Sequence, residues 1–408
     1  MLPLAGIRVL DLTNVLAGPF CGYQLARMGA EVVKIENPQG GDLARRLGSD
    51  VEMAKREMGL SFVAVNAGKQ SIALDLKDTR GKAVFLDLVA GADVVLENFR
   101  PGVMKRLGLD YPVLRERNER IIYCAISGFG QSGPWRDRPA YDQIVQGLAG
   151  VMSVTGDELS APLRTGFPIC DTVGGMTAAF AVCAALVEQR ATGKGRRIDV
   201  SLLESSLATM GWVVSNYLNG GQIPKPMGNE NFTAAPSGTF RTGKGLLNIS
   251  ANEQKQFEKL CDLIGRPELK SDPRFAERQV RKSNREALRD LIEIPLAERS
   301  AAEWEELFNR EGVPSGQVLS VPEILGESQL NERRFVESLA SQTSRGEALR
   351  VTRPGFCLEE DLPVPSAPPV LGADTRSWLQ AIGRSEAEIT ELLDAGIVRV
   401  AQTGERMR

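Results

Sequence analysis

The sequence contains no histidine among its 408 residues. This absence excludes Ser-His-Asp and Cys-His catalysis, histidine-ligated metals and a histidine general base. Chemistry on this chain must therefore use carboxylates, lysine, arginine or backbone amides, and we expect no metal site.

The sequence also lacks paired cysteines, a strong charge and a leader pattern. Its six cysteines are scattered without a C-x-x-C pair, which is typical of a reducing compartment and predicts a cytoplasmic protein. A net charge of -3 argues against nucleic acid or an anionic membrane as partner. The N-terminal residues MLPLAGIRVLDL have no basic region or cleavage site and read as a first strand, and we expect no membrane-spanning segment.

Strand and helix patterns alternate through the first half of the chain. Short apolar runs are followed by glycine-bearing loops and amphipathic segments, which is the pattern of βαβ units. This alternation predicts an α/β fold with a doubly wound, mostly parallel, Rossmann-like sheet. The predicted strands are residues 7–12, 31–36, 71–76, 93–97 and 121–127, and the predicted helices are residues 19–28 and 80–90.

The composition changes after Leu218. Residues 219–231 are rich in glycine, proline and asparagine, as expected of a linker or an active-site loop. A hairpin is predicted over residues 237–250, and charged helices follow. These features predict a second, smaller α+β domain.

Two motifs have conventional interpretations that the surrounding sequence disfavours. Gly128-Phe-Gly-Gln-Ser-Gly133 fits the G-x-G-x-x-G pattern of dinucleotide sites, but Pro134-Trp135 follows where that pattern needs a helix. A flexible active-site loop is the better interpretation. Cys170 has no histidine partner to form a catalytic thiolate, so we interpret it as a packed side chain.

Asp171 is the strongest candidate for chemistry. It precedes Gly174 and Gly175 and a long apolar segment of helical character. One interpretation is a helix N-cap, for which aspartate is favoured. The other is a nucleophile: the two glycines would then admit a ligand, and the helix dipole would keep the carboxylate ionised. These residues alone leave both interpretations open.

The chain as a whole resembles the class III CoA-transferases, the CaiB/BaiF family, which includes formyl-CoA transferase. The resemblance is carried by a series of motifs in family order along nearly the whole chain. They are LAGIRVLDLTNVLAGPFCGYQLARMGAEVVKIENPQGGD, SIALDLKD, ADVVLENFRPGVMKRLGL, ISGFGQSGP, PAYDQIVQGLAG, FPICDTVGGMTAAFAVCAALVEQRATGKGRRIDVSLLES, RPELKSDPRF, EGVPSGQV and APPVLGADT.

The resemblance implies that Asp171 is the catalytic nucleophile. Its carboxylate would attack an acyl-CoA thioester, giving a mixed anhydride and then an aspartyl-CoA thioester from which a carboxylic acid takes the CoA. Coenzyme A would be a substrate, with succinyl-CoA the donor that the resemblance suggests, and there would be no permanently bound cofactor. The family's CoA-contacting positions correspond to Leu16, Ala17, Asn37, Leu74, Asp75, Lys77, Asn98, Phe99, Arg100, Arg106, Arg138 and Tyr141.

The resemblance also implies domain bounds and an assembly. The large CoA-binding and catalytic domain would span residues 1–222 and be completed by residues 326–408, and the small domain would span residues 223–325. Two such chains would form an interlocked homodimer, each subunit a ring threaded through the other.

Two other functions remain to be distinguished. α-Methylacyl-CoA racemases belong to the same superfamily, but they use a histidine where this chain has Tyr141, and the chain has no histidine at all. An acyl-CoA-binding protein without catalysis is the non-enzymatic alternative, and the retained Asp171 disfavours it.

Overall fold

The computed structural model describes residues 1–359 and 361–401 and divides into two compact units. Unit 1 comprises Met1–Val151, Thr165–Gln222 and Asn331–Arg408, and unit 2 comprises Met152–Arg164 and Ile223–Leu330. Residues 152–164, predicted as part of the large domain, thus belong to unit 2. A backbone hydrogen bond of 2.7 Å from the Gly228 amide to the Gly156 carbonyl ties this segment to the rest of the unit.

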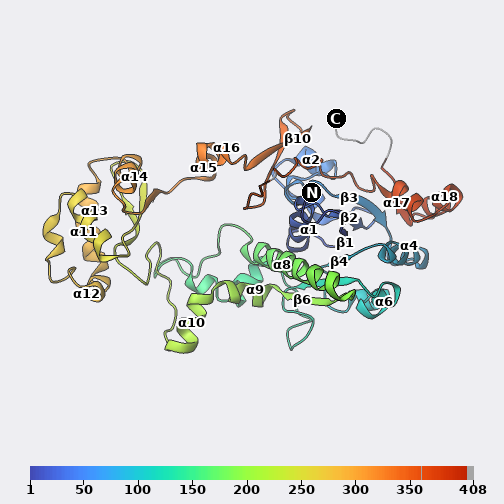
Figure 1. The fold of residues 1–408 in the computed structure, drawn as a ribbon, viewed down its shortest axis with the longest axis horizontal. Coiled ribbons are helices and arrows are strands. Elements are labelled where there is room, and N and C mark those ends of the chain that lie inside the picture. The colour runs from blue at the N-terminus through green and yellow to red at the C-terminus, as the bar shows by residue number, and fades with distance from the viewer. Residues whose placement is uncertain (360, 402–408) are drawn as a thin grey trace. The chain divides into compact units, whose positions relative to one another are not determined.

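Unit 1 is built on a seven-stranded sheet in the order β12-β3-β2-β1-β4-β5-β6 (Figure 1). All neighbouring strands are parallel except β12, which runs antiparallel to β3. The mostly parallel α/β sheet predicted from the sequence is therefore confirmed. Its strands are β1 (Arg8–Asp11), β2 (Glu31–Glu36), β3 (Gln70–Leu74), β4 (Val94–Glu97), β5 (Ile122–Ser127), β6 (Arg197–Ser201) and β12 (Val398–Arg399).

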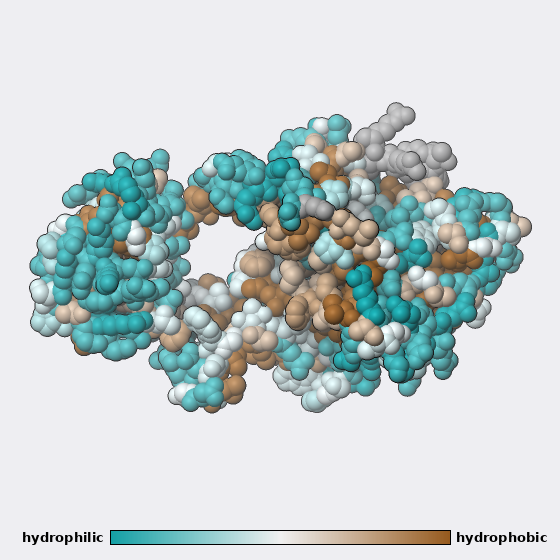
Figure 2. All heavy atoms as spheres, in the orientation of Figure 1, coloured by the Kyte–Doolittle hydropathy of each residue, from teal (hydrophilic) through white to brown (hydrophobic). Residues whose placement is uncertain are grey.

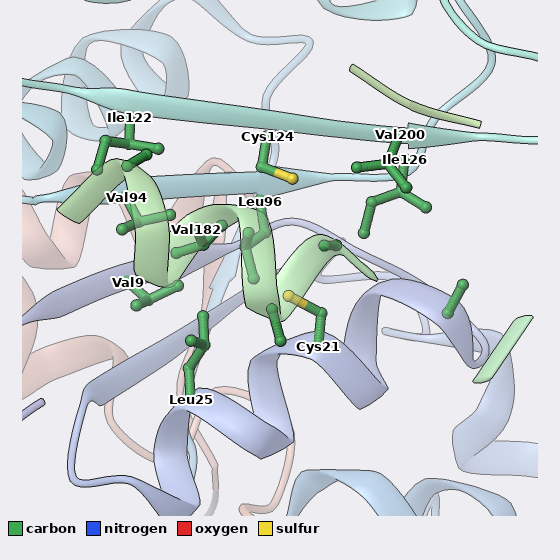
Figure 3. Close-up of a cluster of buried hydrophobic side chains, with 14 of the residues drawn as sticks. Val9, Cys21, Leu25, Val94, Leu96, Ile122, Cys124, Ile126, Val182 and Val200 are labelled. Carbon is green, nitrogen blue, oxygen red and sulfur yellow. The ribbon is translucent and has the colours of Figure 1, made fainter. Parts of the chain in front are cut away.

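Apolar clusters cover both faces of this sheet, because alternate residues of each strand point to opposite sides. Val9 belongs to one cluster and the next residue, Leu10, to the other. Figure 3 shows the first cluster, in which Val182 and Cys21 come from two helices on the same face of the sheet. The helices of unit 1 are α1 (Ala17–Arg27), α2 (Val51–Lys55), α3 (Leu60–Asn66), α4 (Thr79–Ala90), α5 (Val103–Leu107), α6 (Tyr111–Arg117), α7 (Asp142–Leu148), α8 (Ile169–Thr192), α9 (Leu202–Thr209), α10 (Gly211–Gly220), α17 (Thr375–Ala381) and α18 (Glu386–Asp394).

The C-terminal part of the chain completes unit 1. The hairpin of β10 (Val336–Gln342) and β11 (Ala348–Thr352) packs near α1, where the buried Arg27 and Glu337 form an ion pair of 2.7 Å. The Tyr23 hydroxyl donates to the Thr352 carbonyl at 2.7 Å. These contacts join residues more than 300 positions apart in sequence, so the first and last parts of the chain fold as one body.

Unit 2 is a smaller α+β body. Its antiparallel sheet has the order β7-β8-β9, and β7 and β8 form the hairpin predicted over residues 237–250. Helices cover one face of this sheet around Phe257 and Trp304. Its elements are β7 (Ser237–Arg241), β8 (Leu246–Ser250), β9 (Ser315–Gln317), α11 (Gln254–Leu263), α12 (Arg278–Ser283), α13 (Arg285–Leu296), α14 (Ala301–Arg310), α15 (Val321–Gly326) and α16 (Ser328–Glu332), the last of which ends beyond the unit's boundary.

Helix α8 bears on the expectation that the chain has no membrane-spanning segment. With 24 residues, it is long and apolar enough to cross a membrane by length and composition alone, the one such helix among the described residues. One stripe of α8 packs on the sheet, on α1 and on α9, through buried residues such as Ala178 and Val182. We therefore interpret α8 as a central helix of unit 1 with one uncovered face.

Candidate active site

The sequence-predicted CoA residues converge on one edge of the unit 1 sheet. Strands β1 to β5 are parallel, so their carboxyl ends share this edge, and open α/β sheets bind ligands there. Most of the predicted residues lie at the end of strands β1 to β4 or directly after them, and the others lie in the long loop after β5. Leu16 and Ala17 follow β1, Asn37 follows β2, Leu74 to Lys77 end and follow β3, Asn98 to Arg106 follow β4, and Arg138 and Tyr141 follow β5.

Helix α8 brings Asp171 to the same edge. The helix lies between β5 and β6, so it runs back across the sheet and begins at the carboxyl edge. Its first turns pack on the first turn of α1: a Cβ built on Gly175 would lie only 2.4 Å from the Ala17 carbonyl oxygen. Asp171 stands four residues before Gly175, hence on the same face of the helix. Asp171 therefore lies on the face of α8 that packs on the start of α1.

The two glycines have a different role from the one inferred from the sequence. A Cβ on Gly174 would meet the Leu202 side chain at 2.2 Å, and one on Gly175 would meet the backbone of α1. Gly174 and Gly175 thus allow α8 to approach α9 and α1 closely. The interpretation that they admit a ligand is wrong.

Asp171 is not a helix cap. It is the third residue of α8, which begins at Ile169 without a side-chain cap from its own N-terminal residues. Asp142, the first residue of α7, supplies the missing acceptor: its Oδ1 accepts from the amides of Cys170 at 2.9 Å and Asp171 at 3.3 Å. The Gln146 side chain donates to Asp142 Oδ2 at 2.6 Å and fixes the buried carboxylate. The capping interpretation is therefore wrong for Asp171, and the sequence did not single out Asp142.

The electrostatic environment of Asp171 also differs from the expectation of a strongly ionised carboxylate. The half-buried side chain is partly removed from water, and the Asp142 charge lies close by. Burial, and secondarily Asp142, raise the pKa of Asp171 to about 7. A carboxylate with such a pKa is more basic, and hence a better nucleophile, than an exposed aspartate.

The structure agrees with the reasons given against the dinucleotide motif and against a catalytic Cys170. The loop after Gly128 contains no helix until α7 begins at Asp142, so it does not supply the helix that a dinucleotide site requires. Its Gly130 has φ +85°, and the Gln131 amide donates to the Asp199 carboxylate. Cys170 is buried, and burial raises the pKa of its thiol, as expected of a packed cysteine.

The predicted CoA residues divide by exposure. Leu74 and Ala17 are buried, so only their backbone groups are candidates for contact with a ligand. Leu16, Asp75, Asn98 and Phe99 are partly buried. The exposed members include four cationic side chains suited to phosphates, since guanidinium and ammonium groups bind phosphate oxygens by charge-assisted hydrogen bonds. The exposed members are Asn37, Lys77, Arg100, Arg106, Arg138 and Tyr141.

A buried charge network beneath this edge was missed by sequence reasoning. Lys69 pairs with Asp11 at 2.9 Å, Lys34 with Asp42 at 3.0 Å, and Arg45 with Glu36 at 2.7 Å. All six side chains are essentially inaccessible to water, and their charges cancel. Such pairs persist in a protein interior only where the geometry is closely matched. The described residues contain no cluster of three or more acidic, cysteine or histidine side chains able to hold a metal ion.

Comparisons with known proteins identify the family. Residues 4–375 match the model described as CoA-transferase family III. The chain is 36% identical to succinyl-CoA:glutarate CoA-transferase of Mus musculus over 99% of its length and 92% of that protein. It is 40% identical to acetyl-CoA:oxalate CoA-transferase of Acetobacter aceti, covering 82% of this chain and 85% of that one. The crystal structure of a CAIB/BAIF family protein from Brucella suis superimposes with a TM-score of 0.82 at 33% identity, over 93% of this chain and 99% of the other. The chain thus belongs to CoA-transferase family III, the CaiB/BaiF family, and is an enzyme that transfers CoA between acyl-CoA thioesters and carboxylates.

Proposed function

We propose that Asp171 carries the CoA transfer as a covalent nucleophile. The observation that supports this most directly is the raised pKa of a half-buried carboxylate on the face of α8 that packs on the start of α1, at the sheet edge where the predicted CoA residues converge. Its carboxylate oxygen attacks the thioester carbonyl of the donor and expels CoA thiolate, leaving a mixed anhydride. The thiolate then attacks the aspartyl carbonyl and releases the donor acid, so Asp171 holds CoA as a thioester.

The second half of the cycle mirrors the first. The carboxylate of the acceptor acid attacks the aspartyl-CoA carbonyl and expels the thiolate, giving an anhydride between Asp171 and the acceptor. Attack of the thiolate on the acceptor's carbonyl yields the new acyl-CoA and regenerates the Asp171 carboxylate. No water is consumed, and the energy of the thioester bond is conserved through both halves.

We propose succinyl-CoA as the donor and a short dicarboxylic acid as the acceptor. Two relatives support this choice, a succinyl-CoA:glutarate CoA-transferase and a succinyl-CoA–D-citramalate CoA-transferase. Each is 36% identical to this chain. The bound CoA moiety is anionic, and the exposed Lys77, Arg100, Arg106 and Arg138 supply the positive charge that its phosphates need.

A matrix of donors and acceptors tests the substrate proposal. Succinyl-CoA, acetyl-CoA and an uncharged acyl-CoA are each incubated with oxalate, glutarate and a monocarboxylate, and new CoA esters are measured by mass spectrometry. We expect the succinyl-CoA and glutarate pair to give the highest kcat/KM. Preference for a monocarboxylate acceptor would contradict the dicarboxylate assignment. Exchange of the α-proton of a 2-methylacyl-CoA in heavy water would instead indicate a racemase.

We also propose that the enzyme is a cytoplasmic homodimer, interlocked as in the family fold. Large apolar side chains are exposed along the outer face of α8, and Figure 2 shows hydrophobic residues at the surface of unit 1 around this helix. Met176, Phe180 and Val187 are 49%, 76% and 71% exposed. Uncovered apolar surface of this kind marks an interaction site, and a second copy would cover it. Light scattering is expected to give twice the chain mass of 44.3 kDa. A monomer at micromolar concentration would contradict the assembly.

A further inference from the structure

The loops after β1 and β4 meet where the strand order of the sheet reverses direction. β1 pairs with β2 on one side and with β4 on the other, so successive connections leave in opposite directions at this point. Ligands of open α/β sheets bind at such a switch point. Here the loop after β1 leads through residues 12–16 into α1, and the loop after β4 begins at Asn98.

The Asn98 side chain holds these two loops together. Its Oδ1 accepts from the Asn14 amide at 2.8 Å, and its Nδ2 donates to the Asn14 carbonyl at 2.8 Å. This paired contact, here called the Asn98 clasp, satisfies both backbone groups of Asn14. The clasp spans 84 positions of sequence. An amide engaged in this way is suited to fix a loop, which differs from the CoA-contacting role implied by the family resemblance.

The next residue, Val15, is held in a strained conformation. Its φ is +69°, a region that β-branched residues rarely adopt because it is sterically unfavourable for them. The Val15 amide donates to Asp42 Oδ1 at 2.9 Å. Asp42 is itself fixed by Lys34, whose ammonium group also donates to the Thr13 carbonyl at 2.6 Å. Although burial opposes ionisation, Lys34 and the amides of Val15 and Ala44 keep the pKa of Asp42 below its usual value.

This fixed turn sets the direction of the first turn of α1. Leu16 occupies the N-cap position and provides no side-chain acceptor for the amides that follow. Those amides carry the positive end of the helix dipole, which favours negative charge placed near it. The close packing at Gly175 places the first turn of α1 beside the face of α8 that bears Asp171. The negative charge that develops during acyl transfer at Asp171 would thus form beside the start of α1.

We propose that Asn98 and Asp42 are positioning residues of the transfer reaction. They hold the Asn14–Val15 turn so that the start of α1 is aimed at Asp171. This inference depends on the proposed function of Asp171. It assigns to Asn98 an effect on kcat, whereas a side chain that only contacts CoA would affect KM.

The first experiment compares Asn98→Ala with Asn118→Ala. Asn118 is a matched control at the opposite edge of the sheet, where its Nδ2 donates to the carbonyls of Val89 at 3.0 Å and Ala92 at 2.8 Å. We expect Asn98→Ala to lower kcat by about 10- to 100-fold with little change in KM, because misplacement of reacting groups by about 1 Å costs rates of that order. Asn118→Ala should lose similar thermal stability and keep its kcat. An unchanged kcat in Asn98→Ala, or a rise in KM alone, would overturn the proposal.

A variant of the same size separates the hydrogen bonds of the clasp from the bulk of the Asn98 side chain. Asn98→Asp has the same size but turns a carboxylate oxygen toward the Asn14 carbonyl, so it should lose at least as much kcat as Asn98→Ala.

A double variant tests the role of Asp42. In Val15→Gly, the glycine adopts a positive φ without strain. Asp42→Ala should lower kcat, because the Val15 amide loses its acceptor. Val15→Gly introduced into Asp42→Ala should restore part of that kcat. No recovery in a folded double variant would count against the role of Asp42.

Hydrogen exchange distinguishes failure of this inference from failure of the proposed function. Exchange of the peptide spanning residues 12–18 should accelerate in Asn98→Ala and stay unchanged in Asn118→Ala. Equal exchange in wild type and Asn98→Ala would disprove the clasp even if transfer occurs. A wild-type enzyme that transfers CoA normally, with Asp171→Ala equally active, would overturn the nucleophile assignment and the positioning role with it.

Discussion

Replacement of Asp171 by asparagine is expected to abolish CoA transfer and to raise the thermal stability of the protein. Loss of a covalent nucleophile removes both intermediates at once, so we expect kcat to fall by about 10³-fold or more. Asp171→Ala should show the same loss of kcat. It serves as a second variant because asparagine can slowly deamidate to aspartate and restore activity, whereas alanine cannot. Transfer at the wild-type rate in either variant would refute the nucleophile assignment.

The stability gain follows from the direction of the pKa shift. The pKa of Asp171 is about 7 in the folded chain, against an ordinary value of 3.8. Between these values the folded state binds more protons than the unfolded state, so stability falls as pH rises through that window. Asparagine does not titrate. The melting temperature of Asp171→Asn should therefore exceed that of wild type at pH 8, and the difference should shrink toward pH 5.

Trapping with hydroxylamine gives independent evidence on the same residue. Both the anhydride and the aspartyl-CoA thioester react with this nucleophile to give an aspartyl hydroxamate at position 171. We expect peptide mass spectrometry to find the hydroxamate only when donor acyl-CoA is present. A hydroxamate on any other carboxylate of the chain would relocate the nucleophile.

The sequence predicted the parts of the fold that local pattern determines. Strand β5 is an apolar run that is buried throughout, whereas β2 has three apolar residues among charged ones; the predicted positions of both agree with the structure to within one residue. Strand β6 was also missed; its Arg197-Ile-Asp-Val-Ser alternates polar and apolar residues, as suits the edge of the sheet, but has only two apolar residues. β12 was missed because its two residues form a strand only by pairing with β3.

The site was predictable only where one residue carries the signal. Asp171 stands out beside two glycines. The cap of its helix, α8, comes from Asp142, which lies 29 residues before Asp171, and no local pattern connects the two. The same limit applies to Asp42 and Lys34. Charged residues near buried strands acquire a role only from partners that the tertiary fold supplies, and their pairing is visible only in three dimensions.

The second large effect concerns the pH dependence of the reaction, to which the charge of Asp142 should contribute. Attack on the thioester requires an ionised Asp171, so kcat/KM of the wild type should fall about tenfold per pH unit below a midpoint near pH 7. Asp142→Asn removes the nearby negative charge and keeps an oxygen able to accept from the amides of Cys170 and Asp171. The midpoint should therefore move to lower pH. Burial is the larger cause of the raised pKa, so the midpoint should stay above the ordinary 3.8.

Gln146→Leu is the matched control for this prediction. It removes the 2.6 Å hydrogen bond to Asp142 Oδ2 but leaves the Asp142 charge in place. If charge controls the profile, Gln146→Leu lowers the plateau rate without moving the acid limb to lower pH, whereas Asp142→Asn moves the limb. The same midpoint in wild type and Asp142→Asn would show that Asp142 acts on Asp171 through geometry alone. A wild-type midpoint near pH 4 would mean that Asp171 is ionised as readily as an exposed aspartate, and the link between its burial and its nucleophilicity would fail.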